Sequence, residues 1–161
     1  MKHRVPLLLL FAFGVSTLLS AGQPAADLVV VEKARRTLTV FSGNTAVRTY
    51  SVALGPNPKG HKVQAGDGRT PEGRYTIDYK NEKSAYYLAL HISYPNQQDI
   101  LEAKRRGVSP GGDIMVHGLP NGVGAVGQGE DWTRGCIAVT NEEIEEIARL
   151  VPPGTPIEIR P

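Results

Sequence analysis

The chain has 161 residues, of which 40% are hydrophobic and 21% charged, with 18 lysines and arginines against 16 aspartates and glutamates. This length and apolar content fit one globular domain and exclude both wholesale disorder and two domains of ordinary size. A single cysteine excludes an intrachain disulfide framework and a cysteine-rich zinc module. Nucleotide chemistry is disfavoured because no P-loop and no glycine fingerprint between a strand and a helix is present.

The N-terminus has the order of a secretory signal peptide. Residues 1–4 are basic, residues 7–19 are almost continuously apolar, and residues 20–22 are small. The apolar run is shorter than the roughly 18–20 residues that a membrane span needs. We therefore predict a signal peptide over residues 1–22 and one exported domain over residues 23–161, in the periplasm or cell envelope. The alternative is an uncleaved N-terminal anchor, and no other membrane contact is expected.

The charge pattern does not indicate a nucleic-acid-binding surface. Removal of a leader that carries Lys2 and Arg4 leaves 16 basic residues against 16 acidic ones. The one basic cluster, residues 104–106, is better explained as a helix end, where cations meet the negative end of the helix dipole. We expect no nucleic-acid partner, since such binding needs a basic face.

Strand patterns dominate the rest of the chain. Runs rich in β-branched or alternating apolar residues predict strands at 28–31, 37–41, 46–54, 74–79, 86–94, 113–117, 136–139 and 156–160. Residues 55–68 read as a long surface loop, and residues 118–132 are glycine-rich without periodicity. Two short helices are predicted. One spans 97–106 and is closed by Gly107, and the other follows a Thr140–Glu143 capping box and ends at Pro152. The sequence therefore predicts a mainly β fold with about eight short strands and two short helices.

His117 and Cys136 are the sharpest candidates for chemistry. Each lies beside a glycine at a predicted strand end, 19 positions apart, and the glycine-rich segment between them permits the two ends to meet. A thiol is largely protonated near neutrality, and a nearby imidazole can take its proton. Backbone amides of Arg134, Gly135 and Cys136 would then form an oxyanion hole. The residues alone also allow a non-catalytic interpretation, in which Cys136 packs in the core and His117 is only hydrogen-bonded. Against this, an unpaired thiol in an oxidising compartment is open to oxidation unless it is buried or used.

Other candidates are weaker. His61 is expected to be exposed in its polar loop, and His91 to be packed or hydrogen-bonded in a strand. A zinc site from these residues with His117 and Cys136 is disfavoured because the spacings match no zinc motif, and we predict no metal. Trp132 would either line a substrate groove or anchor its loop on the core. Among the tyrosines, Tyr86, Tyr87 and Tyr94 are expected in the sheet, with Tyr94 the best candidate for a place near the site.

Several ordered motifs resemble the L,D-transpeptidase catalytic domain family (YkuD-type). His117-Gly118 is followed, after the glycine-rich stretch, by Thr133-Arg134-Gly135-Cys136. An upstream run over residues 67–77 carries Thr-Pro-x-Gly-x-Tyr-x-Ile. Residues 93–96 and 110–112 also look like a branch of this family, and the resemblance extends from about Asp27 to Arg160.

The resemblance implies that the domain works on peptidoglycan without a cofactor. Cys136 would attack the carbonyl of the third residue of a stem tetrapeptide, and His117 would act as the base. D-Ala would leave, and the stem would pass to an amine of another stem, of a free D-amino acid or of a lipoprotein lysine. Transfer to water would make the same site a hydrolase, and a non-catalytic wall-binding module is the alternative of another class. The candidates for substrate contact are Gly118, Thr133, Trp132 and Tyr94.

Two positions depart from the commoner family pattern. Arg134 stands where many members have histidine, and Ala138 stands where many have arginine or asparagine. Neither change removes the nucleophile or the base. The departures instead put the contacts on the substrate side in question.

Overall fold

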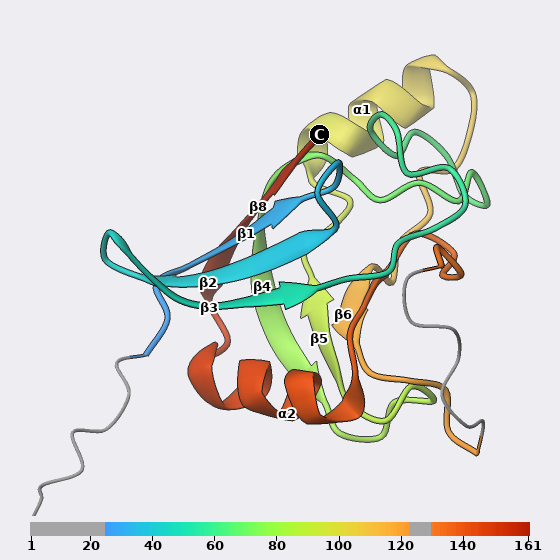
Figure 1. The fold of residues 1–161 in the computed structure, drawn as a ribbon. Helices are drawn as coiled ribbons and strands as arrows, with labels where there is room; N and C mark the ends of the chain where they lie inside the picture. The colour runs from blue at the N-terminus through green and yellow to red at the C-terminus, as the bar shows by residue number, and fades with distance from the viewer. Residues whose placement is uncertain (1–24, 123–129) are drawn as a thin grey trace, which may run out of the picture.

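The computed structural model describes residues 25–122 and 130–161, which form one eight-stranded sheet and two helices (Figure 1). The sheet order is β3-β2-β1-β8-β4-β5-β6-β7. The mainly β fold predicted from the sequence is confirmed. The elements are β1 (Leu28–Glu32), β2 (Thr37–Ser42), β3 (Thr45–Ser51), β4 (Gly73–Asn81), β5 (Ala89–Ile92), α1 (Gln97–Arg105), β6 (Met115–His117), β7 (Ile137–Ala138), α2 (Asn141–Leu150) and β8 (Thr155–Arg160).

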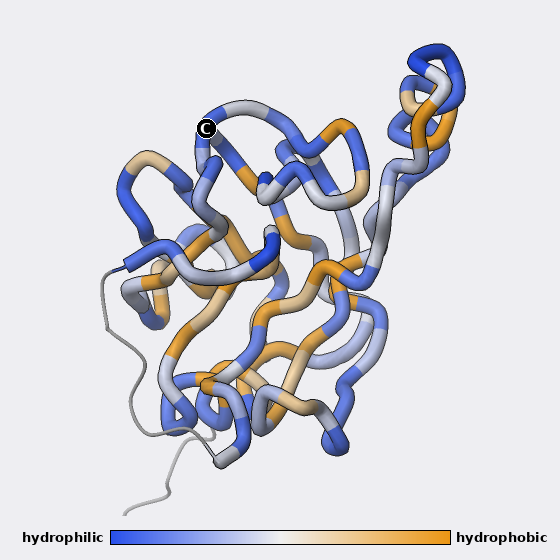
Figure 2. Tube along the Cα trace, turned by 90° about the vertical axis from the view of Figure 1, so that its right-hand side faces the viewer, coloured by the Kyte–Doolittle hydropathy of each residue, from blue (hydrophilic) through white to orange (hydrophobic). Residues whose placement is uncertain are grey.

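The last strand lies in the middle of the sheet. β8 pairs with β1 in parallel and with β4 antiparallel, so it joins the hairpins of the first third of the chain to the strands that lead to the candidate site. Its alternating residues Ile157 and Ile159 are buried, as are Val29 and Val31 of β1. Each such side chain contributes about 1.5–3 kcal/mol when it is fully removed from water. Figure 2 shows hydrophobic stretches of chain in the middle of the molecule, with hydrophilic stretches mostly at its periphery.

Both helices begin with a complete capping box. In α2 the Thr140 side chain accepts from the Glu143 amide at 3.2 Å, and Glu143 accepts from the Thr140 amide at 2.8 Å, as predicted. Asn96 and Asp99 form the same reciprocal pair at the start of α1. The helices lie at opposite ends of the sheet in Figure 1. The buried face of α2 consists of Ile144, Ile147 and Leu150, at the spacing that places residues on one side of a helix.

Strand boundaries differ most from the prediction before β5. The strand expected over 86–94 is only Ala89–Ile92, and Tyr86 and Tyr87 lie outside it. The reason is the backbone of Tyr87, whose φ of 64° is in the left-handed region and cannot continue a strand. The strands expected at 113–117 and 136–139 are likewise shorter, as β6 and β7.

The segment predicted as a long surface loop, residues 55–68, is held together by one internal ion pair. Lys62 is buried and donates to Asp67 Oδ1 at 2.8 Å, and Asp67 also accepts from the backbone amides of Val63, Gln64 and Arg69. These bonds fold the segment around one carboxylate, because each otherwise unpaired amide finds its acceptor there.

Two predictions concern residues that the structure does not describe. The signal peptide over residues 1–22 lies outside the described residues, as does the middle of the glycine-rich stretch 118–132. Within the described ranges, neither helix is long and apolar enough to cross a membrane.

Candidate active site

Adjacent strand ends bring Cys136 and His117 together. β6 and β7 pair in parallel, with His117 opposite Ala138, and continuing that register by one pair places Cys136 beside Met115. Side chains alternate along a strand, so the thiol and the imidazole project from the same face. β6 and β7 are neighbours in the sheet, so Cys136 and His117 lie at the ends of adjacent strands.

His117 is a buried imidazole with one edge fixed. Only 3% of its surface is exposed, and Nδ1 lies 2.7 Å from the Gly118 carbonyl oxygen. A carbonyl only accepts, so Nδ1 carries the proton, and in the neutral ring Nε2 keeps a free lone pair. Burial lowers the pKa of His117, and the bond to the Gly118 carbonyl opposes this only in part. The ring is therefore poised as a neutral base.

Cys136 is a partly buried thiol in its protonated form. Its Sγ donates to the Asp113 carbonyl oxygen at 3.4 Å. Burial raises the pKa of the Cys136 thiol, and the negative charge of Asp113 adds to this. A hydrogen bond with the Met115 backbone and the positive charge of Lys62 act in the opposite direction. The thiol thus needs a base to become a nucleophile, since only the thiolate reacts.

Two aromatic rings enclose the imidazole. The centroid of Tyr86 lies 4.5 Å from that of His117, and the centroid of Trp132 lies 5.7 Å away at 64°, edge to face. The sequence left Trp132 open between a substrate groove and a loop anchor; its ring lies beside His117, and contact with substrate stays a prediction. Tyr86 was not predicted near the site, because the alternation of residues 86–94 assigned it to a strand, and no sequence signal marks the ring that faces His117.

A short turn carries Cys136. The Thr133 hydroxyl donates to the Cys136 carbonyl at 2.8 Å and accepts from the Gly135 amide at 3.2 Å. The Gly135 amide is therefore engaged within the turn. Among the described residues no backbone acceptor is present for the amides of Arg134 and Cys136, and their part in an oxyanion hole stays a prediction.

Backbone packs directly on backbone beneath this turn. Gly135 has a φ of 119°, and a Cβ added there would lie 2.5 Å from the Arg69 carbonyl oxygen. A Cβ on Gly55 would lie 2.1 Å from the Gly68 carbonyl oxygen and 3.1 Å from the Gly135 amide nitrogen. Only glycine permits these approaches. The start of the upstream motif of residues 67–77 thus packs directly beneath the Cys136 turn. We call this backbone contact of Gly55, Gly68 and Arg69 with the turn its floor.

An ion pair anchors the start of the same turn. Arg36, in the turn between β1 and β2, binds Asp131 through Nε at 3.0 and 3.2 Å and through Nη2 at 2.5 Å. Asp131 Oδ1 also accepts from the Leu54 amide at 2.9 Å, and Thr133 donates its own amide to the Leu54 carbonyl. The loop before Cys136 is therefore fixed to the far end of the sheet.

The other predicted contact residues have structural partners. Thr133 is buried in the turn, and a Cβ on Gly118 would lie 2.6 Å from Asn141 Oδ1, so α2 packs where a side chain would be. Tyr94 is buried, and its hydroxyl donates to the Pro110 carbonyl at 2.9 Å. Contact of these residues with substrate stays a prediction. Their positions show them supporting the strands and loops around the site.

The remaining histidines are separate from the site. The expectation that His61 is exposed is wrong: it is half-buried, its Nδ1 accepts from the Glu72 amide at 2.9 Å, and its Nε2 lies 3.1 Å from Asp99 Oδ1. His91 is hydrogen-bonded, as predicted, with Nδ1 2.6 Å from Asp78 Oδ1. No group of three or more metal-binding side chains gathers within residues 25–122 and 130–161.

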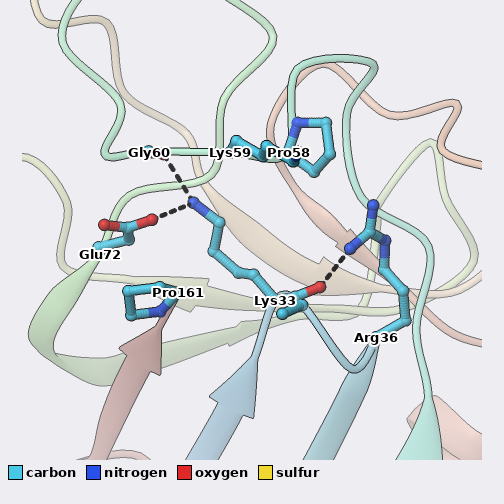
Figure 3. Close-up of a pocket in the computed structure, with 8 residues that line it drawn as sticks. Lys33, Arg36, Pro58, Lys59, Gly60, Glu72 and Pro161 are labelled. Atoms are coloured by element: carbon cyan, nitrogen blue, oxygen red, sulfur yellow. Dashed lines mark hydrogen bonds and ion pairs between the residues drawn. The ribbon is translucent and has the colours of Figure 1, made fainter.

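A cavity of about 310 Å³ lies elsewhere, at the turn between β1 and β2 (Figure 3). Its main feature is the buried Lys33, whose Nζ donates to the carbonyls of Gly60 and Thr70 and to Glu72 Oε1, at 2.7, 3.1 and 2.8 Å. Burial lowers the pKa of Lys33. With all three donors engaged, this lysine stabilises the loop and is not free to bind a ligand.

The fold and the paired thiol and imidazole define a family of enzyme domains. The sequence model of the L,D-transpeptidase catalytic domain (YkuD) matches residues 26–159, and the chain belongs to this family. The resemblance seen in its motifs is confirmed.

Two curated relatives are provisionally named L,D-transpeptidases. The chain is 34% identical to YafK of Escherichia coli over 104 residues, which cover 63% of this chain and 34% of YafK. It is 28% identical to YqjB of Bacillus subtilis over 137 residues, covering 84% of this chain and 72% of YqjB. The chain thus spans about a third of YafK.

Solved structures show the same fold. The helical cell shape determining protein Pgp2 of Campylobacter jejuni is 27% identical with a TM-score of 0.68, over 85% of this chain and 48% of that one. Bd1075 of Bdellovibrio bacteriovorus is 29% identical with a TM-score of 0.60, over 84% and 48%. An L,D-transpeptidase of Mycobacterium smegmatis, at 18% identity and a TM-score of 0.55 over 84% and 59%, shares the fold. The chain spans about half of the first two.

Proposed function

We propose that the chain is an exported cysteine acyltransferase that acts on the stem peptides of peptidoglycan. The observation that carries the proposal is the buried imidazole of His117, bonded through Nδ1 to the Gly118 carbonyl, on the strand adjacent to the one that Cys136 precedes. Membership of the L,D-transpeptidase family supplies the substrate class. The basic, apolar and small segments of residues 1–22 support export.

The first half of the reaction forms a thioester. His117 Nε2 takes the proton of Cys136, and Sγ attacks the carbonyl carbon of the third stem residue. The amides of Arg134 and Cys136 stabilise the resulting oxyanion. The imidazolium then gives its proton to the departing amine, the C–N bond breaks, and D-Ala leaves.

The second half returns the enzyme to its starting state. An incoming amine loses a proton to His117 and attacks the thioester carbon, and the Cys136 thiolate leaves and is reprotonated. The acceptor is an amine on another stem, a free D-amino acid or a lipoprotein lysine. If water is the acceptor, the same groups release a tripeptide, and the protein is a hydrolase. Two solved neighbours of about 28% identity include a cell shape determining protein, which is compatible with either outcome.

The deciding experiment is mass spectrometry of the protein incubated with a purified disaccharide-tetrapeptide, with and without an added D-amino acid. An exchanged or cross-linked product identifies a transpeptidase, and tripeptide alone identifies a carboxypeptidase. Cys136→Ala serves as the control and should give neither product. A wall-binding module without catalysis would show no product and no adduct on Cys136 with an acylating β-lactam.

A further inference from the structure

Tyr86 covers one face of the candidate base. Its ring centroid lies 4.5 Å from that of His117 at 36°, and 6.1 Å from that of Trp132. Tyr86 is 40% exposed, whereas His117 beneath it is 3% exposed. The tyrosine therefore stands between the imidazole and water.

The segment that carries Tyr86 is held in an unfavourable conformation. Tyr87 has a φ of 64°, which a bulky side chain adopts only when its surroundings enforce it. Asn121 supplies much of that enforcement: it accepts from the Tyr87 amide at 2.9 Å and donates to the carbonyls of Ser84 and Ala85. The Tyr87 hydroxyl donates to Glu145 of α2. These contacts fix the position of the neighbouring Tyr86.

Few other contacts fix the orientation of the His117 imidazole. Its one hydrogen bond, from Nδ1 to the Gly118 carbonyl, fixes one edge and leaves the ring free to tilt about that bond. β5 and β7 place only Ala89 and Ala138 beside it in the sheet. Packing by Tyr86 on one side and Trp132 on another restricts this tilt, as rings held by neighbours keep one rotamer.

We propose that Tyr86 is a positioning residue for His117: it holds Nε2 on the face that carries the Cys136 thiol and keeps water from the imidazole. The inference rests on the proposed function of His117 as the base. The Tyr86 phenol packs on His117, Cys136 lies at the end of the adjacent strand, and Glu145 lies one contact further out, at Tyr87. No ion pair to His117 is present in the part of the chain that the structure describes.

The chain offers a matched control. Tyr79 stacks on His91 at the same centroid distance of 4.5 Å and is 45% exposed, but it lies on β4 beside an exposed carboxylate, away from Cys136. Tyr79→Ala thus removes an equivalent ring from an equivalent stack. Tyr86→Phe keeps the ring and removes only the hydroxyl.

The test is a titration of the histidine ring protons by NMR in the full chain, with His117→Gln used to assign the signal. In Tyr86→Ala we expect the pKa of His117 to rise toward the ordinary histidine value of about 6.5, because water reaches the ring. Tyr86→Phe and Tyr79→Ala should leave it unchanged. Since the base acts in its neutral form, kcat/KM for the tetrapeptide should fall by up to about fourfold near pH 6 and change little near pH 8.

An unchanged His117 titration in Tyr86→Ala overturns the inference, as does an equal change in Tyr79→Ala. A rise in KM alone, with the titration unchanged, would assign the ring to substrate contact and also overturn it. If the wild-type chain does not act on the tetrapeptide, the proposed function fails, and the titration still decides whether Tyr86 shields His117.

Discussion

His117 and His91 lie under similar tyrosine rings but in opposite electrostatic settings. His91 pairs with the exposed Asp78 at 2.6 Å. His117 is buried, has a carbonyl in place of a carboxylate, and has a lowered pKa. The contrast shows that a stacked ring alone does not define the environment of a histidine, because the hydrogen-bond partner and the burial differ between the two.

The largest expected effect comes from removing the Cys136 thiol, the proposed nucleophile. Cys136→Ala should abolish turnover while the far-ultraviolet circular dichroism and thermal unfolding stay close to wild type, because the side chain is small and only partly buried. Assays of D-Ala release with both proteins check this. Residual turnover in the variant would mean that another nucleophile is in use.

Exchanging the two histidines for glutamine tests the contrast directly. His117→Gln should lower kcat/KM by about 10²–10⁴-fold, the usual contribution of general acid–base catalysis. His91→Gln should change it less than twofold, because the His91 imidazole pairs with Asp78 and makes no hydrogen bond to His117 or Cys136 among the described residues. The rate of D-Ala release between pH 5 and 8 is the measurement. Comparable losses in the two variants would contradict the role given to His117.

The floor under Cys136 can be tested with a pair of glycine substitutions. Gly135→Ala should destabilise the domain by several kcal/mol and strongly reduce activity, since its Cβ would meet the Arg69 carbonyl at 2.5 Å. Gly43→Ala is the control, because its φ is also positive, at 56°, yet nothing lies within 4 Å. It should cost about 1 kcal/mol. Urea unfolding of both variants measures the difference, and equal costs would contradict the close packing.

The anchor at Asp131 should have a smaller effect. Burial disfavours its ionisation, but hydrogen bonds from Arg36 and Leu54 outweigh this and hold the pKa of Asp131 below its ordinary value. A lowered pKa stabilises the fold above the unfolded-state value of about 3.9, and this contribution is lost as the pH falls through the lower folded-state pKa. Asp131→Asn should therefore cost about 1–2 kcal/mol at pH 7 and progressively less below pH 4.

The control for the Arg36–Asp131 ion pair is a second pair of an arginine and a carboxylate. Arg48 and Glu146 form a more exposed ion pair on the surface, at 2.9 Å. Glu146→Gln should change the free energy of unfolding by less than about 0.5 kcal/mol at every pH, as for most surface pairs. A pH dependence equal to that of Asp131→Asn would contradict the anchoring role.

The features of the fold that depend on residues close together in the sequence could be predicted. Capping at Thr140, the helix stop at Gly107 and the alternation in β8 depend on near neighbours in sequence, and the structure has them where they were predicted. The placement of His117 and Cys136 at the ends of adjacent strands also followed from the sequence, because both stand beside glycines at predicted strand ends, and their joint role in catalysis stays a prediction. What escaped prediction depends on distant contacts. Tyr86 faces His117 only because Asn121 and Glu145 bend the chain at Tyr87.

The central place of β8 has a consequence for how the protein is made. During synthesis β1 and β4 are complete long before residues 155–160 exist, and until then each presents an unpaired edge toward the gap that β8 fills. The sheet cannot close until residues 155–160 have left the ribosome. Completion of this sheet therefore waits for the last strand of the domain, although the strands on either side of it are made much earlier.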